Sequence, residues 1–177
     1  MSDAEERAER LGISLCFGGA NLLDMLEPLW LSLFDHHRDI GSAGLPVVAR
    51  DVSWPRRRAL YESLLAKADA FVLLARRGEQ PVGYVVAHVH EGADDTWPTG
   101  ARIGEIESLA VVAGERGGGL GGILMDAAEA RLAEAGARDV LLHVMVGNDD
   151  ARRFYERRGM IPTMTTMLKL EDRGRHP

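Results

Sequence analysis

The sequence has little cysteine, no long apolar run and no excess of basic residues, and each shortage excludes a class of protein. Cys16 is the only cysteine among 177 residues, so neither an internal disulfide nor a zinc site built from cysteine pairs is available. The net charge of −6 argues against a general nucleic-acid binder, which usually carries a basic face. No apolar run could span a bilayer, and the charged start MSDAEERAER does not resemble a signal peptide. We therefore expect a cytoplasmic protein with no membrane or nucleic-acid partner.

The first half of the chain predicts two helices followed by a hairpin. Residues 1–10 are expected to be a flexible tail or a frayed helix. Residues 13–17 could be a first strand, and a helix is expected after Asn21, with a kink or late start at Pro28. Ser53 as N-cap and Pro55 as an early helical residue predict a second helix to about Lys67. Residues 70–76 and 82–90 are expected to pair as a hairpin around the turn GEQP.

The second half alternates strands and helices. Strands are expected at 104–112, 139–146 and 163–170, with helices at 119–135 and from Asn148 to Gly159. The order predicts one α/β domain over residues 1–177 with a mixed sheet.

The stretch ERGGGLGG, residues 115–122, contains five glycines just before an expected helix. Gly117, Gly119 and Gly122 satisfy the dinucleotide pattern G-x-G-x-x-G. Three features argue against that assignment: residues 113–116 separate the motif from its strand, a hairpin precedes it, and no acidic residue ends the next strand. Free amides at a helix start and flexible glycines still favour an anionic group such as a pyrophosphate. The alternative is a plain glycine-rich connection.

Two motifs lie in and beyond this loop. The first is Arg116-Gly-Gly-Gly-Leu-Gly121, preceded by ESLAV at 107–111. The second is NDDARRFYERRGM at 148–160. Together they resemble the motifs of the GNAT superfamily of acetyl-CoA-dependent N-acetyltransferases, except that Met160 stands where an aromatic residue is more usual. The resemblance implies a mostly antiparallel sheet, splayed after the fourth strand and flanked by about four helices. It also implies acetyl transfer in a ternary complex from acetyl-CoA to a primary amine of a small molecule or peptide.

The resemblance also implies which residues would bind the cofactor. Backbone amides of the glycine loop would hold the pyrophosphate, and strand groups would hold the pantetheine arm. The expected cofactor-binding residues are Leu109, Ala110, Val111, Arg116, Gly117, Gly118, Gly119, Leu120, Gly121, Gly122, Asn148, Ala151 and Tyr155. An amide near Leu109 or Ala110 would stabilise the oxyanion.

For catalysis, the resemblance implies Tyr155 as the general acid that protonates the thiolate, although a packed aromatic beside Phe154 is the alternative. Glu105 and Glu107 are candidate general bases, at the positions used by histone-type and small-molecule members respectively. They share a strand face unless a bulge intervenes. A solvated face or an ion pair is the alternative for either carboxylate.

The sequence indicates the acceptor-binding residues less specifically than the cofactor-binding residues. Trp30, His37, Trp54 and Trp97 are candidate substrate-binding residues, whereas the alternative for Trp30 and Trp54 is core packing. His36 and His37 lack a spaced partner set, so no metal site is expected. A homodimer is expected by analogy with the family. Two other functions stay open: an acyl-CoA-binding sensor or interaction domain without catalysis, and nicotinamide-cofactor binding.

Overall fold

A five-stranded sheet organises the part of the chain that the computed structural model describes, residues 2–41 and 45–171. The strands lie in chain order: β1 (Ser14–Gly18), β2 (Phe71–Arg77), β3 (Gln80–Glu91), β4 (Arg102–Val111) and β5 (Asp139–Leu142). Neighbours are antiparallel except for the parallel pair β4–β5. The predicted hairpin and the mixed, mostly antiparallel sheet are therefore confirmed.

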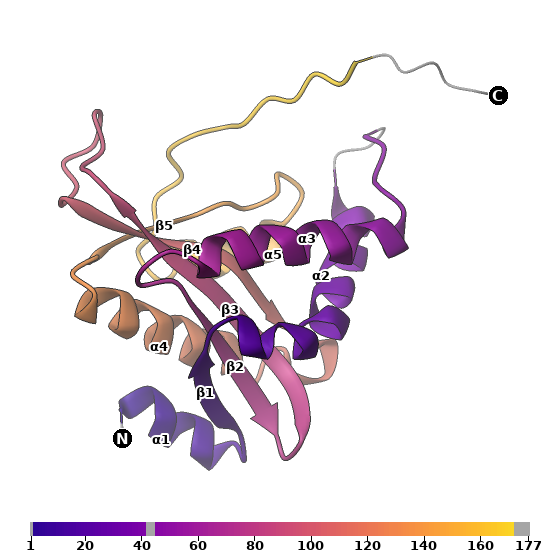
Figure 1. Cartoon of the computed structure of the whole chain (residues 1–177), viewed down its shortest axis with the longest axis vertical. Coiled ribbons are helices and arrows are strands. Elements are labelled where there is room, and N and C mark those ends of the chain that lie inside the picture. Colours follow the sequence, from indigo (N-terminus) through magenta and orange to yellow (C-terminus); the bar gives the residue numbers. More distant parts are fainter. Residues whose placement is uncertain (1, 42–44, 172–177) are drawn as a thin grey trace.

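Helices cover both faces of this sheet (Figure 1). On one face, α1 (Asp3–Arg10) and α4 (Leu120–Glu134) share a core with the inward side chains of β2 and β3. On the other, the 3₁₀ helix η1 (Ala20–Met25), α2 (Glu27–Ile40) and α3 (Arg50–Leu65) enclose a second core. The short helix η2 (Ala113–Glu115) joins β4 to α4, and α5 (Asp149–Glu156) follows β5. None of the described helices has the length and apolarity needed to cross a membrane.

Two irregularities in β4 matter for the site. Its parallel register with β5 runs from Ile103–Asp139 to Ile106–Leu142, while β4 itself continues to Val111. Among the described strands, none pairs with this edge of β4 beyond Ile106, so the predicted splay is confirmed. On the opposite edge, Val86 pairs with Ser108 and Ala87 with Ile106, which leaves Glu107 as the extra residue of a β-bulge.

Close packing of α4 on β4 depends on one glycine. A Cβ at Gly104 would lie 2.6 Å from Leu132 Cδ1, closer than two carbon atoms can approach. Leu132 is fully buried at this contact. Gly104 thus lets α4 lie directly against the strand that carries the candidate carboxylates.

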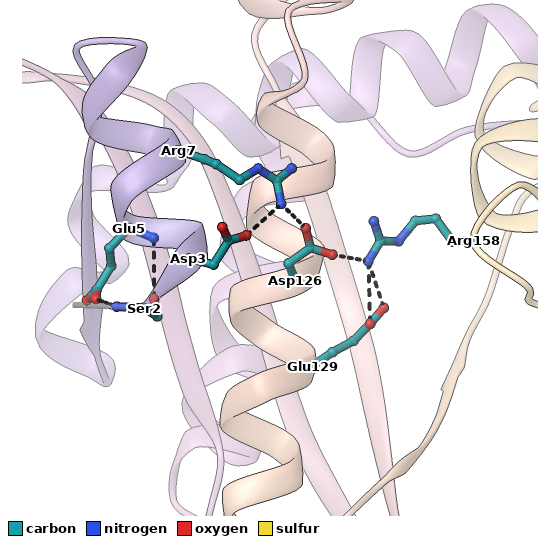
Figure 2. Close-up of polar contacts among 7 residues, drawn as sticks. All are labelled: Ser2, Asp3, Glu5, Arg7, Asp126, Glu129 and Arg158. Carbon is teal, nitrogen blue, oxygen red and sulfur yellow. Dashed lines mark hydrogen bonds and ion pairs between the residues drawn. The ribbon is translucent and has the colours of Figure 1, made fainter.

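The amino-terminal segment differs from the expected flexible tail. Residues 3–10 form α1, capped reciprocally by Ser2 and Glu5, and Ala4 and Ala8 are buried against α4. Figure 2 shows the polar side of this contact: Arg7 donates to Asp126 of α4 at 2.6 Å. The same aspartate accepts from Arg158, just after α5, at 2.5 Å. One carboxylate therefore ties three helical segments together.

The late start expected at Pro28 is confirmed, whereas the start expected at Ser53 is wrong. The first helical stretch is split into η1 and α2, and Pro28 lies in the first turn of α2, where its missing N–H is harmless. The second helix begins at Arg50, not at Ser53, and Pro55 lies inside it. The Ser53 hydroxyl is buried and accepts a hydrogen bond from Trp30 Nε1 at 3.0 Å, so it does not serve as a cap.

The strands predicted near the carboxyl end are also corrected. β5 ends at Leu142 instead of continuing to residue 146. Residues 163–170 form no strand, and Ile161, Met164 and Met167 are at least 80% exposed. This segment runs away from the sheet in yellow in Figure 1. Alternating apolar residues favour a strand only where a partner edge accepts their hydrogen bonds, and this segment pairs with none of the described strands.

We expect Asp126→Asn to lower the free energy of unfolding by about 1–2 kcal/mol at pH 7, because it removes two partly buried ion pairs. Burial raises the pKa of Asp126, but the hydrogen bonds from Arg158 and Arg7 outweigh it and hold that pKa below its usual range. The contribution is therefore present above the ordinary value, about 3.9, and is lost as pH falls through the lowered one.

Urea titrations of both proteins from pH 7 to pH 2.5 would measure this difference. Asp3→Asn is the control, since Asp3 is 80% exposed and pairs with the same arginine. It should cost less than about 0.5 kcal/mol. An equal loss in the two variants, or a loss at Asp126 that does not depend on pH, would contradict the assignment.

Candidate functional site

The glycine loop forms an open turn at the start of α4. Gly117 and Gly119 have φ values of +79° and +89°, which L side chains rarely adopt. Gly119 is the N-cap of α4 without any side-chain cap, so the first amides of the helix have no partner within the helix. A Cβ added at Gly117 or Gly119 would meet no described atom within 4 Å. The turn thus offers free amides, a positive helix end and open space, which suits a pyrophosphate.

Ion pairs and hydrogen bonds hold this turn in place. Arg77 at the end of β2 makes two hydrogen bonds to Glu115, at 2.7 and 2.8 Å. Arg116 donates through Nε to the carbonyl oxygen of Val111 at 2.9 Å. The turn is therefore anchored to β2 on one side and to the end of β4 on the other.

The part of β4 that β5 leaves open leads through η2 into this turn. It contains Leu109, Ala110 and Val111, the residues predicted to bind the pantetheine arm. Their backbone groups on the β5 side have no strand partner among the described residues. An extended amide-bearing chain can add to such an edge as an extra strand does. The open edge and the glycine turn are thus contiguous, and together they fit coenzyme A.

The bulge at Glu107 places both candidate carboxylates on the face of the sheet that α2 and α3 cover. Glu107 accepts a hydrogen bond from Arg57 of α3 at 2.6 Å. The Arg57 guanidinium lies 4.0 Å from the centre of the Trp30 ring. Burial raises the pKa of Glu107 above its usual range, and attraction to Arg57 offsets only part of that rise. Glu107 is therefore a positioned carboxylate with enhanced proton affinity.

Glu105 lies among imidazoles. Its side chain is 11% exposed, and three Nε2 atoms surround its carboxylate: those of His88, His90 and His143. His90 is hydrogen-bonded to it, and His88 and His143 each lie 3.5 Å away. Burial lowers the pKa of His88, although the charge of Glu105 opposes this shift. Glu105 is thus more enclosed than Glu107.

Tyr155 lies on α5, beside the start of α4. Its neighbour Phe154 approaches the first turn of α4, where a Cβ at Gly121 would lie 3.7 Å from Phe154 Cζ. Burial raises the pKa of Tyr155 to about 12, against the opposing effect of Arg158, so the phenol keeps its proton at neutral pH. Asn148 caps α5 as predicted, because its Oδ1 accepts from the amide of Ala151 at 3.2 Å.

The predicted acceptor-site residues separate into two groups. Trp30 and Trp54 are each 6% exposed and pack with Tyr61 in the core beneath α2 and α3. Burial lowers the pKa of His37 to about 4, and repulsion from His36 and from Arg57 contributes to that shift. His37 is therefore close enough to Arg57 for their charges to interact. Trp97 is 45% exposed in the loop between β3 and β4. Trp30 and Trp54 therefore both lie in the core, where Trp30 also contacts Arg57 near His37, whereas Trp97 lies in an exposed loop.

Two groups of residues around the carboxylates were not assigned a role from the sequence. Arg57 belongs to a run of three arginines, and only the fold shows which one turns inward. His88 and His90 alternate on β3, so they share a face. This spacing indicates that the two imidazoles lie on one face of β3. Only the β3–β4 register shows that Glu105 lies opposite His88 on that face.

Comparisons with known proteins identify the family. A model described as "Acetyltransferase (GNAT) family" matches residues 30–160. The chain therefore belongs to the GNAT acetyltransferase family. A curated relative, the mycothiol acetyltransferase of Amycolatopsis mediterranei (strain U-32), is 32% identical over 126 residues. That match covers 71% of this chain but only 38% of the relative, so the chain spans well under half of that protein.

Solved structures show the same fold. A GCN5-related N-acetyltransferase from Ralstonia eutropha JMP134 has a TM-score of 0.70 at 22% identity, over 89% of this chain and 98% of that one. An aminoglycoside N-acetyltransferase in complex with CoA has a TM-score of 0.67 at 14% identity, over 90% and 94% of the two chains.

We expect Gly119→Glu to weaken CoA binding by more than about 100-fold. The substitution adds a negative charge where the phosphates would lie, and it forces an L residue into a φ of +89°. Calorimetry with CoA measures the affinity.

Gly92→Glu is the matched control: Gly92 also has a positive φ, of +100°, and an added Cβ there meets no described atom within 4 Å. That variant should keep its affinity for CoA. If Gly119→Glu bound CoA as tightly as the control does, the pyrophosphate would have to bind elsewhere.

Proposed function

From its membership of the GNAT family, we propose that the chain transfers an acetyl group from acetyl-CoA to a primary amine by direct attack in a ternary complex. One observation carries the proposal: a single strand, β4, has an open backbone edge, bears a carboxylate with raised proton affinity and leads through η2 to the glycine turn. Acetyl-CoA supplies the acetyl group as a thioester.

Glu107 is the proposed proton acceptor. An alkylammonium has a pKa near ~10, so at neutral pH the incoming amine must lose a proton before or during attack. The raised pKa of Glu107 makes it a better acceptor than an ordinary carboxylate, and Arg57 fixes its direction. Glu105 is the other candidate, but its carboxylate is already enclosed by imidazoles. One ammonium proton moves to Glu107, directly or through water, as the nitrogen attacks the carbonyl carbon. The second proton that the nitrogen must lose passes to solvent as the tetrahedral adduct collapses.

The open edge and α5 would stabilise the two remaining negative charges, which develop on the carbonyl oxygen and on the departing sulfur. A backbone N–H near Leu109 or Ala110 would donate to the carbonyl oxygen as negative charge develops there. Tyr155 would donate its proton to the departing sulfur as the carbon–sulfur bond breaks. Its raised pKa keeps that proton in place until the thiolate forms. The products are the N-acetylated amine and the free thiol, after which Tyr155 and Glu107 exchange protons with solvent.

The acceptor is proposed to be a small cationic amine. Glu105 and Glu107 line the face that α2 and α3 cover, and the loop after β3 adds Asp94 and Asp95. Negative charges of this kind attract ammonium groups. The curated relative is named for mycothiol, which supports a small-molecule acceptor.

A screen of amines tests the proposal directly, with thiol release from acetyl-CoA as the readout. The panel should contain polyamines, amino sugars, amino acid amides and peptide amino termini. We expect saturable, amine-dependent thiol release for at least one small amine. Tight CoA binding with no turnover on any amine would support the sensor alternative instead.

We expect Glu107→Gln to lower kcat/KM by about 10²–10⁴-fold, the usual contribution of a general base. In the unmodified enzyme, kcat/KM should fall as pH drops through the pKa of Glu107, which lies above the ordinary ~4.3. The variant should lack this acid limb. Glu105→Gln is the matched comparison: if it abolished the limb while Glu107→Gln kept it, Glu105 would be the base.

Tyr155→Phe should lower kcat by about 100-fold or more while CoA affinity changes little, because the substitution removes the phenolic hydroxyl and keeps the aromatic ring. Phe154→Leu is the control on the same helix and should retain most of kcat. A Tyr155→Phe enzyme with unchanged kcat, in a variant of normal stability, would assign Tyr155 to packing alone.

A further inference from the structure

Two histidines and a glutamate converge at the β3–β4 pair, beside the proposed base and outside its mechanism. Their ligand atoms, His88 Nε2, His90 Nε2 and a Glu105 carboxylate oxygen, all lie within 4.8 Å of one another. His88 and Glu105 are directly opposite in the register, and His90 is two residues further along the same face. The arrangement therefore rests on regular strand geometry and not on a loop.

The chemistry of this trio is unusual for a structural contact. His88 is 2% exposed, and its Nδ1 is buried without a hydrogen-bond partner in the described structure. Its Nε2 faces Glu105 Oε2 at 3.5 Å, too far for a good hydrogen bond. Two imidazoles and one carboxylate are thus directed at a common point.

The spacing suits a first-row divalent cation. Ligands at ~2.0–2.1 Å from a tetrahedral zinc ion lie ~3.4 Å apart, close to the 3.5 Å between His88 and Glu105. His90 lies nearer to Glu105 than that, but its side chain is 45% exposed and has room to turn. His143 Nε2, 3.5 Å from the other oxygen of Glu105, can orient the carboxylate from outside.

We propose that His88, His90 and Glu105 form a binding site for a first-row divalent cation such as Zn²⁺, with a fourth position open to water. The two exposed imidazoles, those of His90 and His143, mark the side from which the ion enters. The sequence did not predict this site, because only His36 and His37 were candidate metal ligands there. It does not depend on acetyl transfer, because its ligands bind the ion without acetyl-CoA.

The test is calorimetric titration of the full chain, first stripped with a chelator, with Zn²⁺ alone. We expect one saturable site per chain and a rise in the thermal unfolding midpoint when zinc is added. His90→Gln and Glu105→Gln should each weaken the affinity by more than about tenfold, the lower range found for loss of even an outer partner. Both avoid truncating the fully buried His88.

His36→Gln is the matched control, since His36 stands beside His37 on α2 and away from the trio. It should leave the zinc affinity unchanged. Substitution of Co²⁺ for Zn²⁺ adds a spectroscopic readout, in which the visible absorption of a tetrahedral site should be lost in His90→Gln. Absence of stoichiometric binding, or equal affinity in the unmodified chain and His90→Gln, would overturn the proposal. Either result would leave the measurements of thiol release unaffected.

Discussion

The whole proposed site depends on where β4 and β5 stop pairing. Their register ends at Ile106 and Leu142, whereas β4 continues for five more residues. Backbone groups on an unpaired strand edge need partners, and an amide-bearing ligand can provide them. The same strand then turns through η2 into the glycine loop, so the open edge leads along the chain to the start of α4. Changing the end of this pairing would displace both halves of the proposed cofactor site.

The bulge in β4 is the second constraint, because it decides which side chains lie on the face that α2 and α3 cover. The extra residue, Glu107, stays on the same face as Glu105 and meets Arg57 of α3. A buried hydroxyl chain lies beneath it: Tyr61 donates to Ser108 at 2.7 Å and contacts the hydroxyl of Tyr84 at 3.0 Å. These bonds satisfy polar groups that burial would otherwise leave without partners. Arg57, which stacks on Trp30 of this core, fixes the direction of the carboxylate that we assign as the base.

Local motifs were readable from the sequence, whereas contacts between distant segments were not. The glycine turn, the Asn148 cap and the β2–β3 hairpin follow from residue type and spacing, and the structure has all three. The N-cap predicted at Ser53 was wrong because the Ser53 hydroxyl accepts a hydrogen bond from the indole of Trp30, 23 residues away. The strand predicted at residues 163–170 was wrong because an alternation of apolar and polar residues does not by itself provide a partner strand. The histidines around Glu105 required the β3–β4 register, which no local pattern encodes.

The central claim, that coenzyme A occupies the open edge of β4 and the adjoining turn, is tested most directly by hydrogen–deuterium exchange. Exchange is compared for the chain alone and with saturating CoA. We expect amides of residues 109–111 and 117–121 to exchange more slowly with CoA, because the ligand would accept their hydrogen bonds. Amides of β1 and β2, on the far side of the sheet, should not change. Protection confined to other elements, or none at all at saturation, would contradict the account.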